Sequence, residues 1–186
     1  MELDKYPLAE ELKGVLLDEE TISKRLDELA AEINEAYKDL EEPLILVGVL
    51  KGSFIFLADL SRRLTIPHIV DFISISSYGM KGNKRGEVRL VMDTRENLSG
   101  HDVLIVEDIL DSGATVSYLV KAFSARNTKS VKVAVFIDKP HKREAAVTID
   151  YKGFDIPDVW VVGYGLDYKE RHRTLPFLAE MVVPEE

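Results

Sequence analysis

The sequence predicts an α/β fold: a doubly wound, mostly parallel sheet flanked by helices, with a small hood. Two observations lead to this prediction. Strand and helix patterns alternate along the 186 residues, and such units build parallel sheets with right-handed crossovers. Several strands are unbroken apolar runs, such as VLIV at residues 103–106, which is typical of strands buried on both faces. The length suits a single domain over residues 1–186.

The composition is ordinary for a globular protein, with 46% hydrophobic and 31% charged residues. The sequence has no cysteine, so disulfides and thiolate metal sites are excluded. The formal net charge of −9 argues against general affinity for nucleic acid or for acidic membranes. The N-terminus is acidic where a signal peptide is basic, and no apolar run reaches membrane-spanning length. We therefore expect a cytoplasmic protein.

In the first half of the chain, predicted helices alternate with predicted strands. Apolar residues recur at helical spacing over residues 18–40, with Asp18 as the N-cap. A strand over 43–50 ends at Lys51-Gly52, and a helix follows up to residue 64. A strand over 68–76 then leads into a basic, glycine-rich loop, and an extended pattern resumes at 87–92.

The second half continues the alternation. The central strand at 103–106 is followed by a helix beyond Thr115, a strand over 131–137 and a last strong strand over 159–162. The N-terminal segment and roughly residues 165–186 should build the hood.

Candidate chemistry is concentrated in residues 107–115, EDILDSGAT, between the central strand and a helix. Open α/β sheets bind ligands at this edge. The helix start suits a phosphate, because it offers unpaired N–H groups and a positive dipole end. Glu107 and Asp108 would repel a phosphate and suit the vicinal hydroxyls of a sugar. The helix start consists of small residues: Ser112, Gly113, Ala114 and Thr115. Taken singly, each of these residues is about as well explained as a helix cap.

The whole string closely resembles the phosphoribosyl-pyrophosphate signature of the purine phosphoribosyltransferases. The resemblance extends from about residue 10 to the C-terminus, towards the hypoxanthine-guanine branch of that family. It implies transfer of 5-phosphoribosyl from phosphoribosyl pyrophosphate to hypoxanthine or guanine, giving IMP or GMP plus pyrophosphate in purine salvage. It also implies Mg²⁺ as cofactor and a homo-oligomer, either a dimer or a tetramer.

The resemblance assigns roles to individual residues. Asp111 matches the general base or hydrogen-bond partner at N7 of the purine. Glu107 and Asp108 hold the ribose hydroxyls beside the metal, and residues 112–115 hold the 5′-phosphate. The residues assigned to pyrophosphate are Leu50, Lys51, Gly52, Ser77, Tyr78, Arg143 and Arg173. Those assigned to the base are Lys139, Trp160, Val161 and Asp167, and the metal ligands are Asp167, Glu107 and Asp108.

Several of these assignments have a specific form. The family carries a non-proline cis peptide at the position of Leu50–Lys51, and Ser77-Tyr78 matches the start of a mobile loop over the site. Lys139 would donate to the oxygen on C6 of the purine, Trp160 would stack on the ring, and Val161 would offer its backbone carbonyl. From composition alone, Trp160 is about as well explained as a core residue. The four histidines show no metal-ligand spacing and are expected to be non-catalytic.

Two alternatives remain open. One is a transferase that prefers xanthine or uses adenine. The other is a non-catalytic regulator that keeps this fold to sense phosphoribosyl pyrophosphate. Lys139, Trp160 and Asp167 favour the enzyme, together with Asp111, because a sensor need not retain a set of residues that handles the base.

Overall fold

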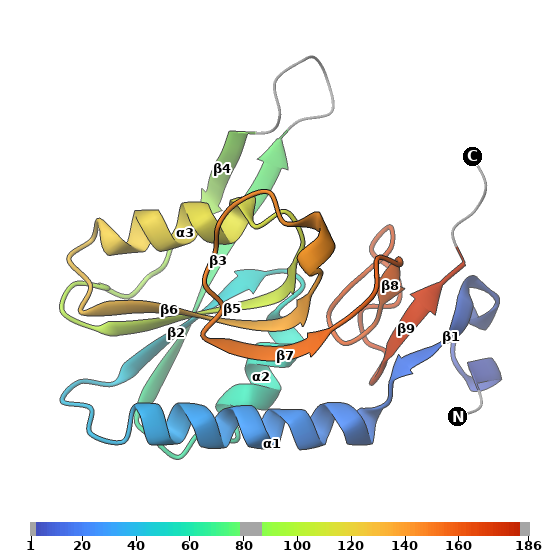
Figure 1. The fold of residues 1–186 in the computed structure, drawn as a ribbon, viewed down its shortest axis with the longest axis horizontal. Helices are drawn as coiled ribbons and strands as arrows, with labels where there is room; N and C mark the ends of the chain where they lie inside the picture. Colours follow the sequence, from blue (N-terminus) through green and yellow to red (C-terminus); the bar gives the residue numbers. More distant parts are fainter. Residues whose placement is uncertain (1–2, 79–86, 183–186) are drawn as a thin grey trace.

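The computed structural model describes residues 3–78 and 87–182 and has a six-stranded sheet at its centre (Figure 1). The strand order is β4-β3-β2-β5-β6-β7. Neighbouring strands from β3 to β7 pair in parallel, and only β4, at the edge, runs antiparallel to its neighbour β3 among the described strands. The bounds are β2 (Leu44–Leu50), β3 (His68–Tyr78), β4 (Glu87–Met92), β5 (Asp102–Leu110), β6 (Ser130–Asp138) and β7 (Tyr151–Asp155). The predicted mostly parallel sheet is confirmed.

Helices cover both faces of this sheet. Helices α1 (Glu19–Ala36) and α2 (Phe54–Ser61) lie on one face, and α3 (Ala114–Ser124) lies on the other (Figure 1). The side chain of Asp18 caps α1 by accepting a hydrogen bond from the N–H of Thr21 at 2.8 Å, as predicted. The first two helices are shorter than expected, since α1 ends at Ala36 and α2 at Ser61.

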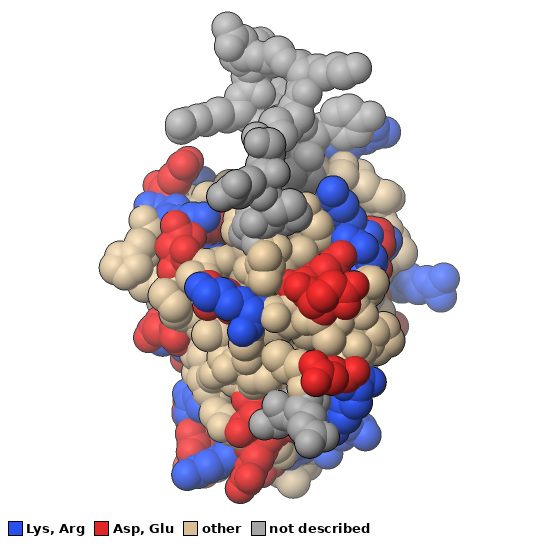
Figure 2. Space-filling view, turned by 90° about the vertical axis from the view of Figure 1, so that its right-hand side faces the viewer, with Lys and Arg blue, Asp and Glu red and all other residues tan. Residues whose placement is uncertain are grey.

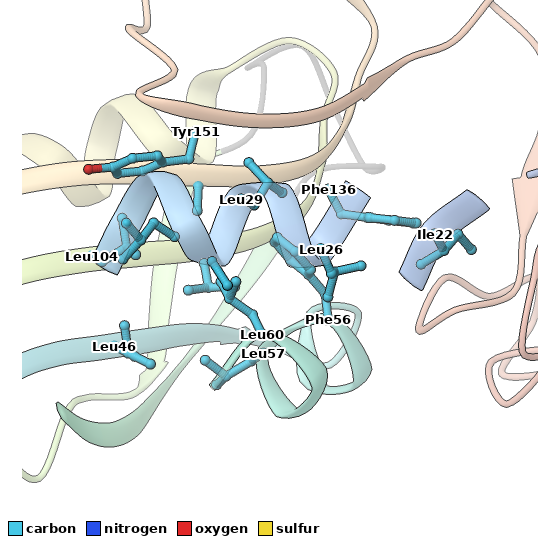
Figure 3. Close-up of a cluster of buried hydrophobic side chains, with 14 of the residues drawn as sticks. Ile22, Leu26, Leu29, Leu46, Phe56, Leu57, Leu60, Leu104, Phe136 and Tyr151 are labelled. Atoms are coloured by element: carbon cyan, nitrogen blue, oxygen red, sulfur yellow. The ribbon is translucent and has the colours of Figure 1, made fainter. Parts of the chain in front are cut away.

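The two-sided burial explains the unbroken apolar strands. Side chains alternate between the faces of a strand, so Leu44 and Leu46 of β2 pack with α1 and α2, whereas Ile45 and Val47 pack with α3. Figure 3 shows the first of these cores, where leucines of α1 and α2 meet the sheet. The labelled side chains are Ile22, Leu26, Leu29, Leu46, Phe56, Leu57, Leu60, Leu104, Phe136 and Tyr151.

A second, three-stranded sheet forms the hood beside the main sheet (Figure 1). It consists of β1 (Leu12–Leu17), β9 (Leu178–Met181) and β8 (Val161–Val162), in the antiparallel order β1-β9-β8. The hood joins the N-terminal segment to the C-terminal stretch, as predicted. Its own core contains Val162 and the fully buried Phe177.

Two features of the sheets differ from the sequence prediction. The last strong strand was expected over residues 159–162, but the structure has a two-residue strand that belongs to the hood. The main sheet ends instead with β7, whose sequence YKGFD lacks an apolar pattern. The central strand β5 also continues beyond Val106 to Leu110, because its pairing with β6 extends to Leu110 and Asp138.

Among the described residues, no helix is long and apolar enough to cross a membrane.

Candidate functional site

The candidate site lies at the carboxyl ends of β2, β5 and β6. Because these strands are parallel, the segments that follow them meet at one edge of the sheet. Lys51-Gly52 follows β2, Asp111 follows β5 and Lys139 follows β6. Most residues predicted to form the site are therefore brought together by the topology.

The segment between β5 and α3 surrounds a cavity of about 270 Å³. Its lining includes all nine residues from Glu107 to Thr115, together with Val49, Ile75 and Val116. Gly113 has a φ of 82°, a left-handed conformation in which glycine is favoured. A Cβ at this position would also come within 3.2 Å of the carbonyl oxygen of Ala145. The N-terminus of α3 lines this cavity, and the N–H of its first residue, Ala114, donates to Oγ of Ser112 at 3.3 Å.

Glu107 and Asp108 lie within β5 rather than beyond it. Glu107 is buried, and its Oε1 accepts a hydrogen bond from the N–H of Asp108 at 3.3 Å, whereas its Oε2 has no partner among the described residues. Burial and the neighbouring charge of Asp108 raise the pKa of Glu107 well above its usual range. Burial also raises the pKa of Asp108. An unpartnered buried carboxylate oxygen suits a ligand that brings a hydroxyl or a cation.

Two glycines allow the main sheet to meet the loop after β8. A Cβ at Gly52 would lie 1.5 Å from Oδ2 of Asp108, and a Cβ at Gly165 would lie 1.9 Å from the carbonyl oxygen of Gly52. Gly165 also has a φ of 103°. The Leu50–Lys51 peptide bond just before this contact is cis, which confirms that prediction. The role of Gly165 was not predicted, because a glycine in a turn does not show which distant backbone segment it will contact.

The predicted pyrophosphate cations Lys51 and Arg173 are held beside each other by a residue that the sequence did not single out. Glu170 accepts from Nζ of Lys51 at 3.0 Å and from Nη2 of Arg173 at 3.2 Å. Arg173 also pairs with Oδ1 of Asp167 at 2.7 Å and donates to the carbonyl oxygen of Gly165 at 2.7 Å. These two cations therefore form one cluster between the main sheet and the loop after β8.

Arg143 lies elsewhere. Its guanidinium pairs with the buried carboxylate of Asp138, and its Nε donates to the carbonyl oxygen of Asp111 at 3.3 Å. Its Cδ lies 3.0 Å from the place that a Cβ on Gly113 would take. Arg143 thus contacts the backbone between β5 and α3, and the structure does not bring this residue into the cluster of Lys51 and Arg173.

A second cavity, of about 320 Å³, gathers the residues predicted to read the base. Lys139 is buried, and its Nζ donates to the carbonyl oxygen of Val159 at 2.7 Å. Burial lowers the pKa of Lys139. Trp160 is 60% exposed, so it is not a core residue. Its ring lies edge-on to the ring of Tyr168, with 6.4 Å between the two ring centroids. The predicted residues lining this cavity are Asp111, Lys139, Trp160, Val161 and Asp167. Asp111 lines both cavities.

The remaining predicted residues lie at the end of β3. The backbones of Ser77 and Tyr78 pair with Val88 and Glu87 of β4. The loop predicted to close over the site, residues 79–86, lies outside the described residues. No cluster of three or more histidine, aspartate or glutamate side chains that could hold a metal occurs in the ranges 3–78 and 87–182.

His172 has a structural partner in the hood. Its side chain is 2% exposed, and its Nε2 lies 2.6 Å from Oε2 of Glu11, which also pairs with Arg171. This contact links the N-terminal segment to the loop that carries Arg173. Its partners come from opposite ends of the chain, so spacing along the sequence gave no indication of it.

Comparisons with known proteins identify the family of this chain. The family model of the phosphoribosyl transferase domain matches residues 14–169. The chain is 44% identical over 172 residues to a hypoxanthine phosphoribosyltransferase of Salmonella typhimurium, covering 92% of this chain and 97% of the relative. It is 45% identical over 168 residues to a hypoxanthine-guanine phosphoribosyltransferase of Bacillus subtilis, covering 90% and 92%. A solved structure of the Trypanosoma cruzi hypoxanthine phosphoribosyltransferase in complex with the product IMP is 40% identical, with a TM-score of 0.86, and covers 93% of this chain and 96% of its own.

Proposed function

The chain belongs to the phosphoribosyl transferase family, and we propose that this enzyme transfers 5-phosphoribosyl from phosphoribosyl pyrophosphate to N9 of hypoxanthine or guanine, releasing pyrophosphate. The observation that carries the proposal is the buried ammonium of Lys139 in a cavity shared with Asp111 and Trp160. This cavity adjoins the one at the N-terminus of α3 through Asp111. A base and a sugar phosphate can therefore be bound side by side.

The segment from β5 to α3 holds the sugar phosphate. The 5′-phosphate accepts hydrogen bonds from the first N–H groups of α3, helped by the hydroxyls of Ser112 and Thr115. The ribose hydroxyls donate to Glu107 and Asp108. The unpartnered Oε2 of Glu107 supports this assignment, because a hydroxyl donor would satisfy it.

Pyrophosphate is bound at the cluster of Lys51 and Arg173, with the backbone of Leu50–Lys51–Gly52 close by. The transition state resembles an oxocarbenium ion at C1 of ribose, while negative charge builds on the leaving group. Fixed cations aimed at that charge stabilise it. Most of the rate enhancement comes from holding the base and the sugar in line.

The base is read mainly by Lys139. An ammonium has three N–H donors, and one of them is used by the carbonyl oxygen of Val159. The other two can meet the oxygen on C6 of a 6-oxopurine, whereas the amino group of adenine would present another donor. Trp160 offers an exposed ring face for stacking, and Val161 supplies a backbone carbonyl at the 2-position. Asp111 accepts a proton or a hydrogen bond at N7.

The donor set fits a divalent metal, for which we propose Mg²⁺. Mg²⁺ typically uses one or two carboxylates together with substrate phosphates, which agrees with separate carboxylates at Glu107, Asp108 and Asp167. When bound, the metal would offset charge on the pyrophosphate. The two oxygens of Asp167 accept from Arg173 and from the N–H of Glu170 at 2.7 and 2.8 Å, and each oxygen keeps a lone pair with which it could bind the metal.

A competition assay tests the proposal. The protein, Mg²⁺ and phosphoribosyl pyrophosphate are mixed with hypoxanthine, guanine, xanthine or adenine, and nucleotide formation is measured. Formation of IMP and GMP supports the proposal. Efficient use of xanthine or adenine would refute the assigned base specificity, and a protein that binds phosphoribosyl pyrophosphate without turnover would be a sensor. A cytoplasmic location and a homo-oligomeric state stay predictions from the sequence.

A further inference from the structure

Glu170 contacts both cations that the proposed function assigns to pyrophosphate. Its Oε1 lies 3.0 Å from Nζ of Lys51 and its Oε2 lies 3.2 Å from Nη2 of Arg173. One carboxylate thus bridges a cation from the loop after β2 and a cation from the loop after β8. This is the arrangement that two oxygens of a phosphate would adopt between the same cations.

The backbone conformation at Glu170 is unfavourable for glutamate, which indicates that its side chain has a function. Tyr168 and Arg171 exchange backbone hydrogen bonds of 3.2 and 3.0 Å across a tight turn. The two residues between them, Lys169 and Glu170, have φ values of 51° and 63°. Asparagine and glycine are favoured at both central positions of such a turn, and other residues add strain there. Glutamate therefore strains the backbone of this turn.

The contact between Glu170 and Lys51 is also easy to exchange. The side chains of Lys51 and Glu170 are 66% and 65% exposed, and exposed ion pairs are weak because water screens them. A ligand with several charged oxygens can replace a single carboxylate at these cations.

We propose that Glu170 is an internal competitor for pyrophosphate, whose carboxylate occupies Lys51 and Arg173 in the empty site and must leave when the pyrophosphate group binds. This inference rests on the proposed function. It makes Glu170 a positioning residue that sets the affinity for pyrophosphate and for phosphoribosyl pyrophosphate, while leaving the affinity for the purine unchanged. The benefit is that the two cations stay near their working positions when no substrate is bound.

Calorimetric titration with inorganic pyrophosphate and excess Mg²⁺ tests the proposal. An ion pair to an exposed carboxylate is worth about two- to fivefold in an equilibrium constant. Glu170→Gln removes the charge from both contacts, so it should tighten pyrophosphate binding by about 4- to 25-fold. Glu170→Asp keeps the charge, tolerates the left-handed backbone and is too short to bridge both cations. It should therefore also bind pyrophosphate more tightly than the wild type. The KM for phosphoribosyl pyrophosphate should fall in both variants, and the KM for hypoxanthine should not change.

The matched control is Glu28→Gln on α1, which removes an exposed glutamate paired with Arg25 at 2.8 Å. It should bind pyrophosphate as the wild type does. The proposal is overturned if Glu170→Asp behaves as the wild type, because charge alone would then be acting, or if either Glu170 variant binds more weakly. An equal gain in the control would overturn it as well. Absence of nucleotide formation by the wild type would refute the proposed function, a separate result that does not depend on these binding constants.

Discussion

Replacing Gly52 with alanine would test how closely the loop after β2 approaches Asp108, which we assign to the ribose hydroxyls. The added Cβ would lie 1.5 Å from Oδ2 and 2.4 Å from Cγ of Asp108, whereas real Cβ contacts are essentially never shorter than 3.0 Å. Gly52 does not have a positive φ, so alanine meets no intrinsic backbone penalty at this position. The substitution is a test of contact alone.

The two effects of this change should differ in size. The carboxylate of Asp108 can rotate away, so the loss of folding free energy should stay near the lower end of the about 1–3 kcal/mol typical of overpacking. To reach an allowed contact, Oδ2 must move by roughly 1.5 Å, and a misplacement of about 1 Å in an active site can cost about 10²-fold in rate. Gly52→Ala should thus remain folded and lose about 10²-fold or more in kcat/KM for phosphoribosyl pyrophosphate.

Steady-state nucleotide formation and thermal unfolding measure the two effects separately. Gly14→Ala in β1 is the matched control, because a Cβ there meets nothing within 4 Å. That variant should keep full activity. Near-wild-type activity in a folded Gly52→Ala protein would refute the assignment of Asp108 to the ribose, or the close approach itself.

Four further outcomes are expected. Asp111→Asn should lower kcat by about 10²-fold or more if Asp111 handles a proton, and a folded variant with the wild-type rate would show that Asp111 handles no proton. Lys139→Gln should relax the preference for hypoxanthine over adenine in competition assays, since an amide can both donate and accept, and an unchanged preference would show that Lys139 does not read the base. Burial and Asp108 raise the pKa of Glu107, so the folded state loses stability as pH rises through that pKa. Glu107→Gln should therefore increase Tm relative to the wild type at about pH 8 and by less at about pH 5, and the opposite trend would contradict the raised pKa. Gly165→Ala should lower the free energy of unfolding by at least about 1–3 kcal/mol, as measured by urea unfolding, because its Cβ would lie 1.9 Å from the backbone oxygen of Gly52.

The parts of the fold and site that could be predicted from the sequence are those specified locally. Residues 103–115 contain a buried strand, its terminal carboxylates and the start of a helix in one continuous segment. Their relative placement follows from chain connectivity and from the edge at which parallel strands end. Lys51 and Lys139 were also predictable, because each follows another apolar strand of the same sheet.

The parts that could not be predicted depend on contacts between distant segments. Strand β7 has no apolar pattern and is an edge strand only because β6 offers a free side for pairing. Val161–Val162 reads as a core strand, but its neighbour in space is β9 of the hood. The ion pair of Arg143 with the buried carboxylate of Asp138 was not foreseen, and the assignment of Arg143 to pyrophosphate stays a prediction. Pairing of this kind is decided by tertiary packing, which a single sequence does not reveal.

The acidic character of the chain is compatible with an anionic substrate because the cations of the site are already compensated. The formal net charge is −9, and acidic and basic side chains are interspersed over the face that carries the hood (Figure 2). Lys51 and Arg173 each contact a carboxylate, whereas Lys139 contacts a neutral carbonyl. If pyrophosphate binds there as proposed, it exchanges one set of negative oxygens for another, so its binding does not require a large field of positive charge. A neutral purine bound at Lys139 would displace no carboxylate.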